Sequence, residues 1–458
     1  MQHDYLGNPV TCARADTVKA IDDFIDGFLS YETRAEGILQ AADADSECCI
    51  ANVYAGLLWM MLEAPDAAER AAPYFEAAER RLVGATEREQ MNAAVLRAWV
   101  AGEMLDAIRM SGEISDRFAG DLAMVKLHQY LEFNRGNSPA MLRTALKALE
   151  HHPYNAYVHG MAAFAYEQCH LLQEAEQAAR TALSLKRKEP WAQHALAHVM
   201  LTRGRIDEGA RFLEGVAATW VGLNSFMLTH LWWHLALFKL SQGRFADVLE
   251  IYDQHCWGVA KNYSQDQIGA VSLLARMEIA GVDVGARWQD LGNHLAARAR
   301  DTVLPFLTVQ YLYGLARARR AEADSLLETV RSLARTPPPD GSEVWREVTL
   351  PACEGVYAYA RCEYESAWQH LSGAMPRLAE IGGSHAQRDL FEQILVDAAI
   401  KGGRSVAAQQ ILELRRPADP QGVPLNTALG EVYAALGLTA LSREARLRAA
   451  ATRARHPR

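Results

Sequence analysis

Residues 156–172 read AYVHGMAAFAYEQCHLL and residues 190–206 read PWAQHALAHVMLTRGRI, and the two stretches align when residue 156 is placed on residue 190. In this alignment His170 falls on the turn glycine Gly204. The offset matches the period of the tetratricopeptide repeat, about 34 residues, in which a pair of antiparallel helices cannot bury its apolar face alone. The stretch 154–253 therefore predicts helical hairpins that follow one another along the chain.

The repeat pattern extends beyond this stretch. Gly243 follows Gly204 after a slightly longer interval, and Gly437 follows Gly403 at the same offset as the two aligned stretches. Apolar stripes of helical period follow one another from residue 16 onward, while residues 1–13 read as an irregular lead-in. We therefore predict an all-α fold, an α-solenoid (superhelix) of tetratricopeptide-like helical hairpins without strands.

One stretch interrupts the pattern. Residues 336–341 read TPPPDG, and three consecutive prolines are too stiff and too poor in backbone donors for a helix. We expect it to separate an N-terminal and central block of repeats, residues 1–335, from a C-terminal block, residues 342–458. The second block is expected to continue the first.

Composition bounds the class of protein. The formal net charge of −9 disfavours a nucleic-acid binder, which would carry a basic face. No apolar run reaches the roughly 20 residues that a membrane-spanning helix needs, and the first residues lack a secretory signal. The seven cysteines lack C-x-x-C pairing, which favours reduced thiols. We expect a cytoplasmic protein that binds neither nucleic acid nor membrane, with a homodimer as one option.

Two pairs of histidines lie in the later repeats. His194 and His198 are four residues apart, as are His230 and His234, so each pair projects from one side of its own helix. The first helix of such a repeat lines the concave wall, so both pairs are expected to face one groove. Four imidazoles could transfer protons, bind a metal or contact a ligand, although packing against neighbouring helices is the simplest interpretation.

No metal site is predicted from a motif. The zinc-protease motif carries a glutamate directly after its first histidine, and Ala195 and Leu231 occupy those positions. The chain also lacks a phosphate-binding loop and a glycine-rich dinucleotide motif, so no cofactor is expected.

A second group of polar residues lies far along the chain, where residues 382–389 read GGSHAQRD. The two glycines end one helix, and Ser384 can cap the next, whose first N–H groups suit an anion. A capped helix start is the simpler interpretation. The candidate binding residues after the cap are His385, Gln387, Arg388 and Asp389.

We expect the two groups to meet in one pocket, because a superhelix can curl back on itself. The test is whether His234 and Arg388 come to the same region. The candidate walls of the pocket are Trp233, Trp257 and Asp266.

Five segments together resemble the tetratricopeptide repeat protein 38 family. They are WAQHALAH at 191–198, HLWWHLALF at 230–238, YD at 252–253, RW at 287–288 and GGSHAQRD at 382–389. The resemblance covers most of the chain. It implies a helical repeat fold and gives no defined activity.

The chain departs from this family at two places. Members commonly carry a histidine and a glutamate two and three residues after His198, where this chain has Met200 and Leu201. They also tend to have an F-N-D-x-H run, where residues 306–310 read FLTVQ. A metal or a carboxylate–histidine relay in the family's groove would therefore be lost or reshaped here.

The sequence is compatible with two functions. The first is a binding module whose inner pocket, lined by histidine, tryptophan and arginine, holds a small molecule or a peptide. The second is a cofactor-independent hydrolase or lyase, in which the central histidines move protons and Arg388 fixes an anionic substrate. An enclosed pocket would favour the enzyme, and an open groove a peptide binder.

Overall fold

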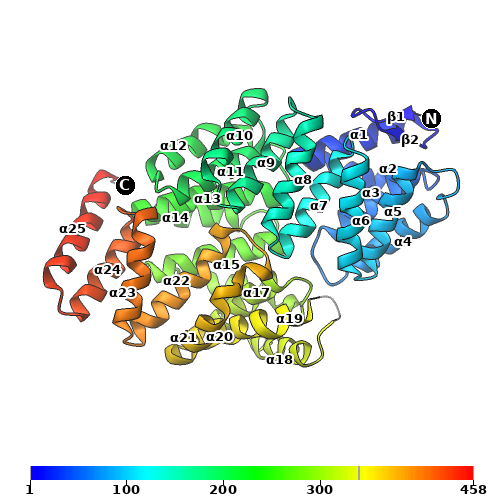
Figure 1. Cartoon of the computed structure of the whole chain (residues 1–458). Coiled ribbons are helices and arrows are strands. Elements are labelled where there is room, and N and C mark those ends of the chain that lie inside the picture. Colours follow the sequence, from blue (N-terminus) through cyan, green and yellow to red (C-terminus); the bar gives the residue numbers. More distant parts are fainter. Residues whose placement is uncertain (1, 339–340, 457–458) are drawn as a thin grey trace. The chain divides into compact units, whose positions relative to one another are not determined.

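A computed structural model of the chain describes residues 2–338 and 341–456. Successive helices pack against one another as antiparallel hairpins, such as α9 (Ala156–Gln168) on α10 (Leu172–Leu185) and α24 (Val423–Ala435) on α25 (Thr439–Arg455) (Figure 1). The prediction of an all-α solenoid of tetratricopeptide-like hairpins is confirmed. The predictions also included Met1, Pro339, Asp340 and Arg458, which lie outside the described residues.

The chain divides into two compact units. The first consists of Met1–Leu196 with Thr219–Asn224, and the second of Ala197–Ala218 with Ser225–Arg458. The dividing point falls inside α11 (Pro190–Thr202), so this helix contributes to both units. The boundary predicted at the proline-rich stretch stays a prediction.

The first unit is built from two short strands and a series of helices. These are β1 (Gln2–His3), β2 (Pro9–Val10), α1 (Ala15–Ser30), η1 (Thr33–Glu36), α2 (Gly37–Ala44), α3 (Cys49–Met60), α4 (Ala67–Glu79), α5 (Glu87–Val100), α6 (Met104–Arg117), α7 (Leu122–Asn134), α8 (Ser138–His151), α9, α10 and the start of α11.

The second unit begins with the end of α11. The elements after it are α12 (Ile206–Val216), η2 (Ala217–Thr219), α13 (Ser225–Gln242), α14 (Phe245–Ile251), η3 (Tyr252–Cys256), α15 (Ser264–Ile279), α16 (Arg287–Leu295), η4 (Ala296–Arg298), α17 (Pro305–Arg317), α18 (Glu322–Arg335), α19 (Ser342–Val344), η5 (Trp345–Thr349), α20 (Leu350–Ala360), α21 (Tyr364–Ala374), η6 (Met375–Ile381), α22 (His385–Lys401), α23 (Ser405–Arg415), η7 (Arg416–Ala418), α24 and α25.

The turn inside each hairpin has the same backbone conformation. The aligned residues His170, Gly204 and Gly243 have φ angles of 58°, 67° and 78°. This left-handed region is open to glycine at little cost and is rarely adopted by other residues. The aligned turn positions therefore share one conformation, in agreement with the repeat alignment.

The lead-in before the first helix is not wholly irregular, which corrects the expectation of a chain without strands. β1 and β2 pair antiparallel, with Gln2 opposite Val10 and His3 opposite Pro9. The chain reverses between them through a turn in which Gly7 N–H donates to the Asp4 carbonyl at 2.8 Å. The pair is only two residues long on each side and leaves the helical repeat unchanged.

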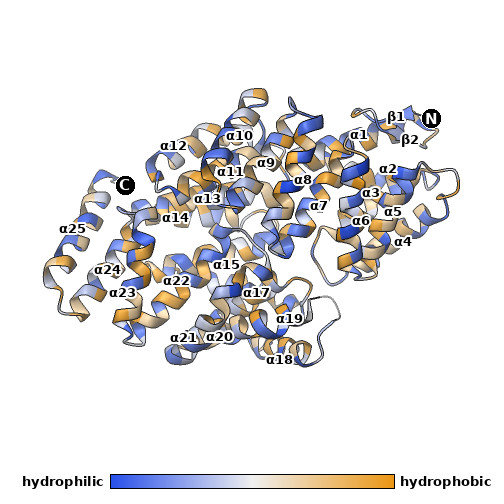
Figure 2. Cartoon of the chain, in the orientation of Figure 1, coloured by the Kyte–Doolittle hydropathy of each residue, from blue (hydrophilic) through white to orange (hydrophobic). Residues whose placement is uncertain are grey.

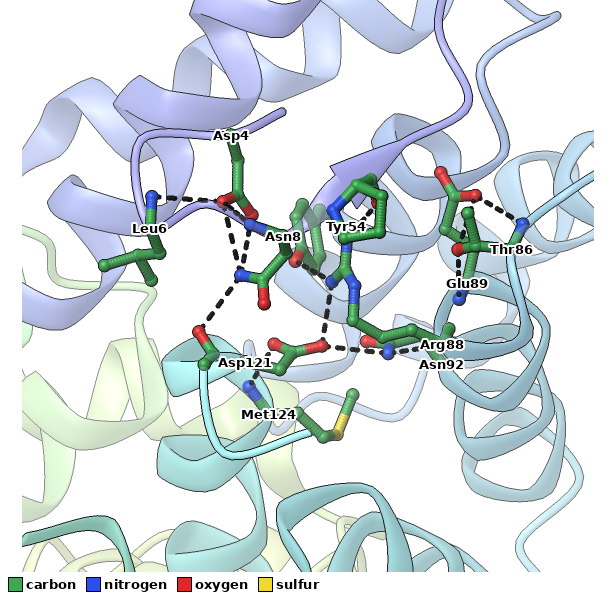
Figure 3. Close-up of polar contacts among 12 residues, drawn as sticks. Asp4, Leu6, Asn8, Tyr54, Thr86, Arg88, Glu89, Asn92, Asp121 and Met124 are labelled. Carbon is green, nitrogen blue, oxygen red and sulfur yellow. Dashed lines mark hydrogen bonds and ion pairs between the residues drawn. The ribbon is translucent and has the colours of Figure 1, made fainter. Parts of the chain in front are cut away.

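A buried polar network ties this lead-in to the helices of the first unit (Figure 3). Arg88 of α5 donates to the Asp121 carboxylate at 2.9 Å and to the Pro9 carbonyl at 3.2 Å. Asn92 also donates to Asp121 at 3.1 Å, and Asn8 donates to the Gly120 carbonyl at 3.0 Å. The lead-in is thus held by specific hydrogen bonds as well as by apolar packing.

Apolar and polar residues are interspersed along the helices, as the mixed colouring of Figure 2 shows. Two helical stretches are irregular, because α19 continues into the π-turn η5 and α21 ends in the 3₁₀ segment η6. All seven cysteines are free thiols, as predicted. Among the described helices, none combines the length and the apolar character needed to cross a bilayer.

Candidate functional site

The centre of the second unit is α13, a helix with almost no exposed face. It packs against α12, α14, α15 and α24. Apolar residues such as Leu231 and Phe238 are fully buried, and the polar residues between them are buried as well. His230 is 9% exposed and His234 is 0% exposed. Any polar side chain on this helix must therefore find its partners inside the protein.

Three imidazoles gather around α13. The His198 ring, from the part of α11 in the second unit, lies 4.5 Å from the His234 ring, and the His230 ring lies 4.8 Å from His234, centroid to centroid. One ring nitrogen of each of these three histidines lies within 4.8 Å of the others. The two helices thus bring the predicted histidines together.

His194 lies one turn earlier on α11, in the part that belongs to the first unit. There its ring stacks on Trp191 at 4.5 Å and contacts Phe164 at 5.1 Å. These contacts place His194 among aromatic side chains.

Trp233 joins the imidazoles to an arginine that sequence reasoning missed. The His230 ring stacks on the Trp233 ring, with centroids 5.2 Å apart and planes 8° from parallel. The Arg276 guanidinium of α15 lies over the Trp233 ring, 5.4 Å from the centroid. Arg276 is itself only 2% exposed, so this cation–π contact is shielded from water.

Arg276 also reaches the second predicted group. It donates to the Ala386 carbonyl in the first turn of α22 at 2.7 Å and lies 3.7 Å from the Asp389 carboxylate. Asp389 is shared, because Arg415 of α23 lies 2.6 Å from its other oxygen. A row of side chains therefore runs from His230 through Trp233 and Arg276 to Asp389. These side chains come from α13, α15 and α22, which are far apart in the sequence.

Burial sets the charges along this row. Burial, with a further contribution from His198, lowers the pKa of His230 to about 3, so this imidazole is neutral at pH 7. Burial also lowers the pKa of Arg276 to about 10, and Asp389 offsets that only in part. Burial alone would raise the pKa of Asp389, but Arg415 and then Arg276 lower it below its ordinary value. Asp389 is thus ionised, with Arg415 its closer partner.

The turn before α22 is organised by its own residues. Ser384 accepts from the Gln387 N–H at 3.3 Å, and its N–H donates to the Gln387 side chain at 2.9 Å, which forms a capping box. Arg388 folds back onto the turn, where it donates to the Gly382 and Gly383 carbonyls. Its guanidinium lies 3.5 Å from His385. The capped-start interpretation therefore accounts for Ser384 and Gln387.

The two remaining predicted wall residues lie at different places in the second unit. The Asp266 carboxylate accepts a hydrogen bond from the Thr229 hydroxyl at 3.1 Å. Thr229 directly precedes His230 in the sequence. Burial raises the pKa of Asp266 to about 6. Trp257 instead donates to Asp290 of α16 at 2.5 Å, and its ring contacts His294. Asp266 is therefore bonded to the histidine helix α13, whereas Trp257 is bonded to α16.

A separate polar cleft of about 260 Å³ opens elsewhere in the second unit. Its charged groups already pair with residues nearby: Arg317 donates to both oxygens of Glu278, and Lys401 lies 2.7 Å from Asp397. The residues that line it are Glu278, Val282, Arg317, Tyr359, Cys362, Tyr364 and Lys401. Because these charges are matched, the cleft is a weaker candidate than the row at α13.

No known protein-family profile matches the chain. The solved structures similar to it include the human IFIT1 dimer with PPP-AAAA, at 14% identity and a TM-score of 0.43, with 96% of this chain and 95% of that chain covered. An IFIT1 monomeric mutant with Gppp-AAAA has 12% identity and a TM-score of 0.42, with 95% and 99% covered. The P58(IPK) TPR domain has 12% identity and a TM-score of 0.24, with 80% and 92% covered. These values are too low to say anything of function.

Proposed function

We propose that the second unit binds a small molecule that carries a hydrogen-bond acceptor, with a carboxylate as the favoured group, beside His230, Trp233 and Arg276. This deepens the binding module predicted from the sequence and favours a small ligand over a peptide. The three side chains are nearly or fully buried, and an extended peptide needs an open groove.

The observation that carries this proposal is the Trp233 indole N–H. This donor is buried and has no hydrogen-bond partner among the described residues. A buried donor without a partner costs about 1–3 kcal/mol, so proteins rarely keep one without a reason. An acceptor on a bound molecule would satisfy it.

The charge of Arg276 supports an anionic acceptor. Its carboxylate partner lies 3.7 Å away and is shared with Arg415, which is closer at 2.6 Å. The Arg276 Nε–H also has no partner among the described residues. A carboxylate beside Arg276 would add the negative charge that the buried guanidinium lacks, through a charge-assisted hydrogen bond.

The acid–base alternative is less well supported at this place. A general base works best with a pKa near the operating pH. The pKa of His230 is lowered to about 3, which makes this imidazole a weak base at pH 7. We therefore assign His230 to stacking and to shaping the binding region.

We also propose that the chain belongs to the tetratricopeptide repeat protein 38 family and works in the cytoplasm. In support, two of the segments that carry the resemblance, 230–238 and 382–389, supply parts of the same row of side chains. The departures at Met200 and Leu201 replace polar residues of that family with apolar ones.

The test is a thermal-shift screen of the full chain against small carboxylates, with phosphates and short peptides as comparison sets. A ligand that binds only the folded chain raises its melting temperature. Trp233→Phe keeps the ring and removes the N–H, and we expect it to weaken a carboxylate hit by about tenfold or more, measured by calorimetry.

Trp288→Phe is the matched control. Trp288 lies on α16, is also buried, and its indole N–H also lacks a partner among the described residues. It should leave the affinity unchanged. Equal affinity of the Trp233→Phe variant and the unchanged chain for every hit would reject the proposal, as would hits confined to peptides.

A further inference from the structure

We propose that His198, His230 and His234 bind a divalent transition-metal ion of the zinc class through their imidazole nitrogens. This metal site adjoins the ligand-binding region proposed above through His230, which stacks on Trp233, but its ligand atoms are imidazole nitrogens and it does not depend on the Trp233 indole N–H or on Arg276.

The distances between the histidine ring nitrogens are only slightly longer than those between ligands that share one metal ion. One ring nitrogen from each of the three histidines lies within 4.8 Å of the others. Zinc binds imidazole nitrogen at about 2.0–2.1 Å, which places two tetrahedral ligands roughly 3.4 Å apart. The remaining closure is at most about 1.5 Å, within the range of ring rotation about the broad final torsion of histidine.

The positions on the helices also fit a metal. His230 and His234 stand four residues apart on α13, so both rings project from one face, the spacing by which a helix offers two histidines to one ion. His198 comes from the preceding repeat and contacts His234 ring to ring. Two separate helices thus hold the set, which fixes the ligands more firmly than a loop would.

The donor chemistry selects the kind of ion. The group consists of histidines alone, with no carboxylate in it. Imidazole suits zinc, copper and nickel, whereas calcium and magnesium require oxygen ligands.

Burial distinguishes this group from surface histidines that bind metal weakly. His198 and His234 are 1% and 0% exposed, and the apolar residues next to them, such as Leu231 and Leu235, are buried too. Ligands held in a dry, packed shell need little ordering when the ion binds.

The experiment is a zinc titration of the full, untagged chain after treatment with EDTA, measured by competition with a chelating dye. We expect one zinc ion per chain and no comparable binding of magnesium. His234→Gln and His198→Gln, one on each helix, should each weaken zinc binding by at least about 100-fold.

His255→Gln is the matched control, because His255 lies in the same unit and stacks on Trp232 at 3.8 Å, outside the group of three. It should leave zinc affinity unchanged, and circular dichroism should show all variants folded. Equal zinc affinity of the His234→Gln variant and the unchanged chain would overturn the proposal, as would a folded chain that binds no zinc.

A second measurement covers the case in which both glutamine variants fail to fold. X-ray absorption of the zinc-loaded, unchanged chain should show imidazole scattering from about three ligands. A shell of oxygen atoms alone would overturn the proposal. Repeating the carboxylate screen in EDTA separates the two ideas, since ligand binding by Trp233 and Arg276 does not require the ion.

Discussion

Each unit contains an arginine with about the same very low exposure, and these two arginines are held differently. Arg88 in the first unit and Arg276 in the second are both 2% exposed, and in both the Nε–H has no partner among the described residues. Arg88 lies 2.9 Å from Asp121, and among the described residues no second cation pairs with this carboxylate (Figure 3). Arg276 lies 3.7 Å from Asp389, which Arg415 holds more closely.

The pKa values reflect this difference. Burial alone would lower the pKa of Arg88, but Tyr54 and Asp121 raise it above its ordinary value. Burial lowers the pKa of Arg276 to about 10 in spite of Asp389. A buried arginine that has a carboxylate to itself, as Arg88 has, stabilises the fold and is called a structural tie here. A buried arginine that shares its carboxylate with a second cation, as Arg276 does, can accept another anion. The contrast is why we place the ligand in the second unit.

The largest expected effect is on the tie in the first unit. Arg88→Met removes the cation and leaves Asp121 buried with neutral donors only, which should lower the free energy of unfolding by about 3–5 kcal/mol. Urea unfolding of the full chain measures this. Arg109→Ala is the control: its pairs with Asp106 and Glu113 are exposed, so a much smaller change is expected than for Arg88→Met. A similar small change in both variants would contradict the assignment of Arg88 as a tie.

The next effect concerns a buried carboxylate of the first unit. Glu189 is fully buried, and burial raises its pKa from 4.5 to about 7. Between pH 4.5 and about 7 the folded chain therefore keeps a proton on Glu189 that the unfolded chain releases. The contribution of this protonated carboxyl to the free energy of unfolding is fully present below pH 4.5 and is lost as the pH rises through 7. The free energy of unfolding, relative to Glu189→Gln, should fall by up to about 3 kcal/mol over this range.

Urea unfolding at a series of pH values measures this difference. Glu113→Gln, at an exposed position, is the control variant. A flat difference between the Glu189→Gln variant and the unchanged chain would show that burial of this carboxyl does not set its proton uptake.

The smallest expected effect on stability is at Arg276. Arg276→Met removes the guanidinium, but Asp389 keeps Arg415 at 2.6 Å and Gln393 at 2.6 Å. The free energy of unfolding should therefore change by about 1 kcal/mol or less, while binding of a carboxylate ligand is lost. Unfolding in urea and calorimetry with the hit from the screen measure the two effects. A loss as large as that of Arg88→Met would make Arg276 a second tie.

The helices were predictable because their signal is local. The repeat offset fixes the hairpins, and the two aligned stretches 156–172 and 190–206 each begin with a helix, α9 (Ala156–Gln168) and α11 (Pro190–Thr202). The N-terminal strand pair was missed because such short strands carry no periodicity. The π-turn at Trp345–Thr349 was missed because one inserted residue leaves the apolar pattern almost unchanged.

The site was predictable only in part, for the same physical reason. Residues four apart on one helix reveal the His230 and His234 pair, but Arg276 meets Ala386 across 110 positions of sequence. A signal was present: Arg276 is the lone charge in the otherwise largely apolar run 268–277. A single cation inside such a run must be buried and therefore needs a partner.

The helix α13 has one more consequence. Because four neighbouring helices enclose it, a substitution anywhere along its length presses on a packed neighbour and has no free side on which to be absorbed. The outward faces of the surrounding helices can drift freely in evolution, whereas this central segment can change only together with the residues that enclose it. Sequence variation among descendants of this chain should therefore be lowest along 227–242.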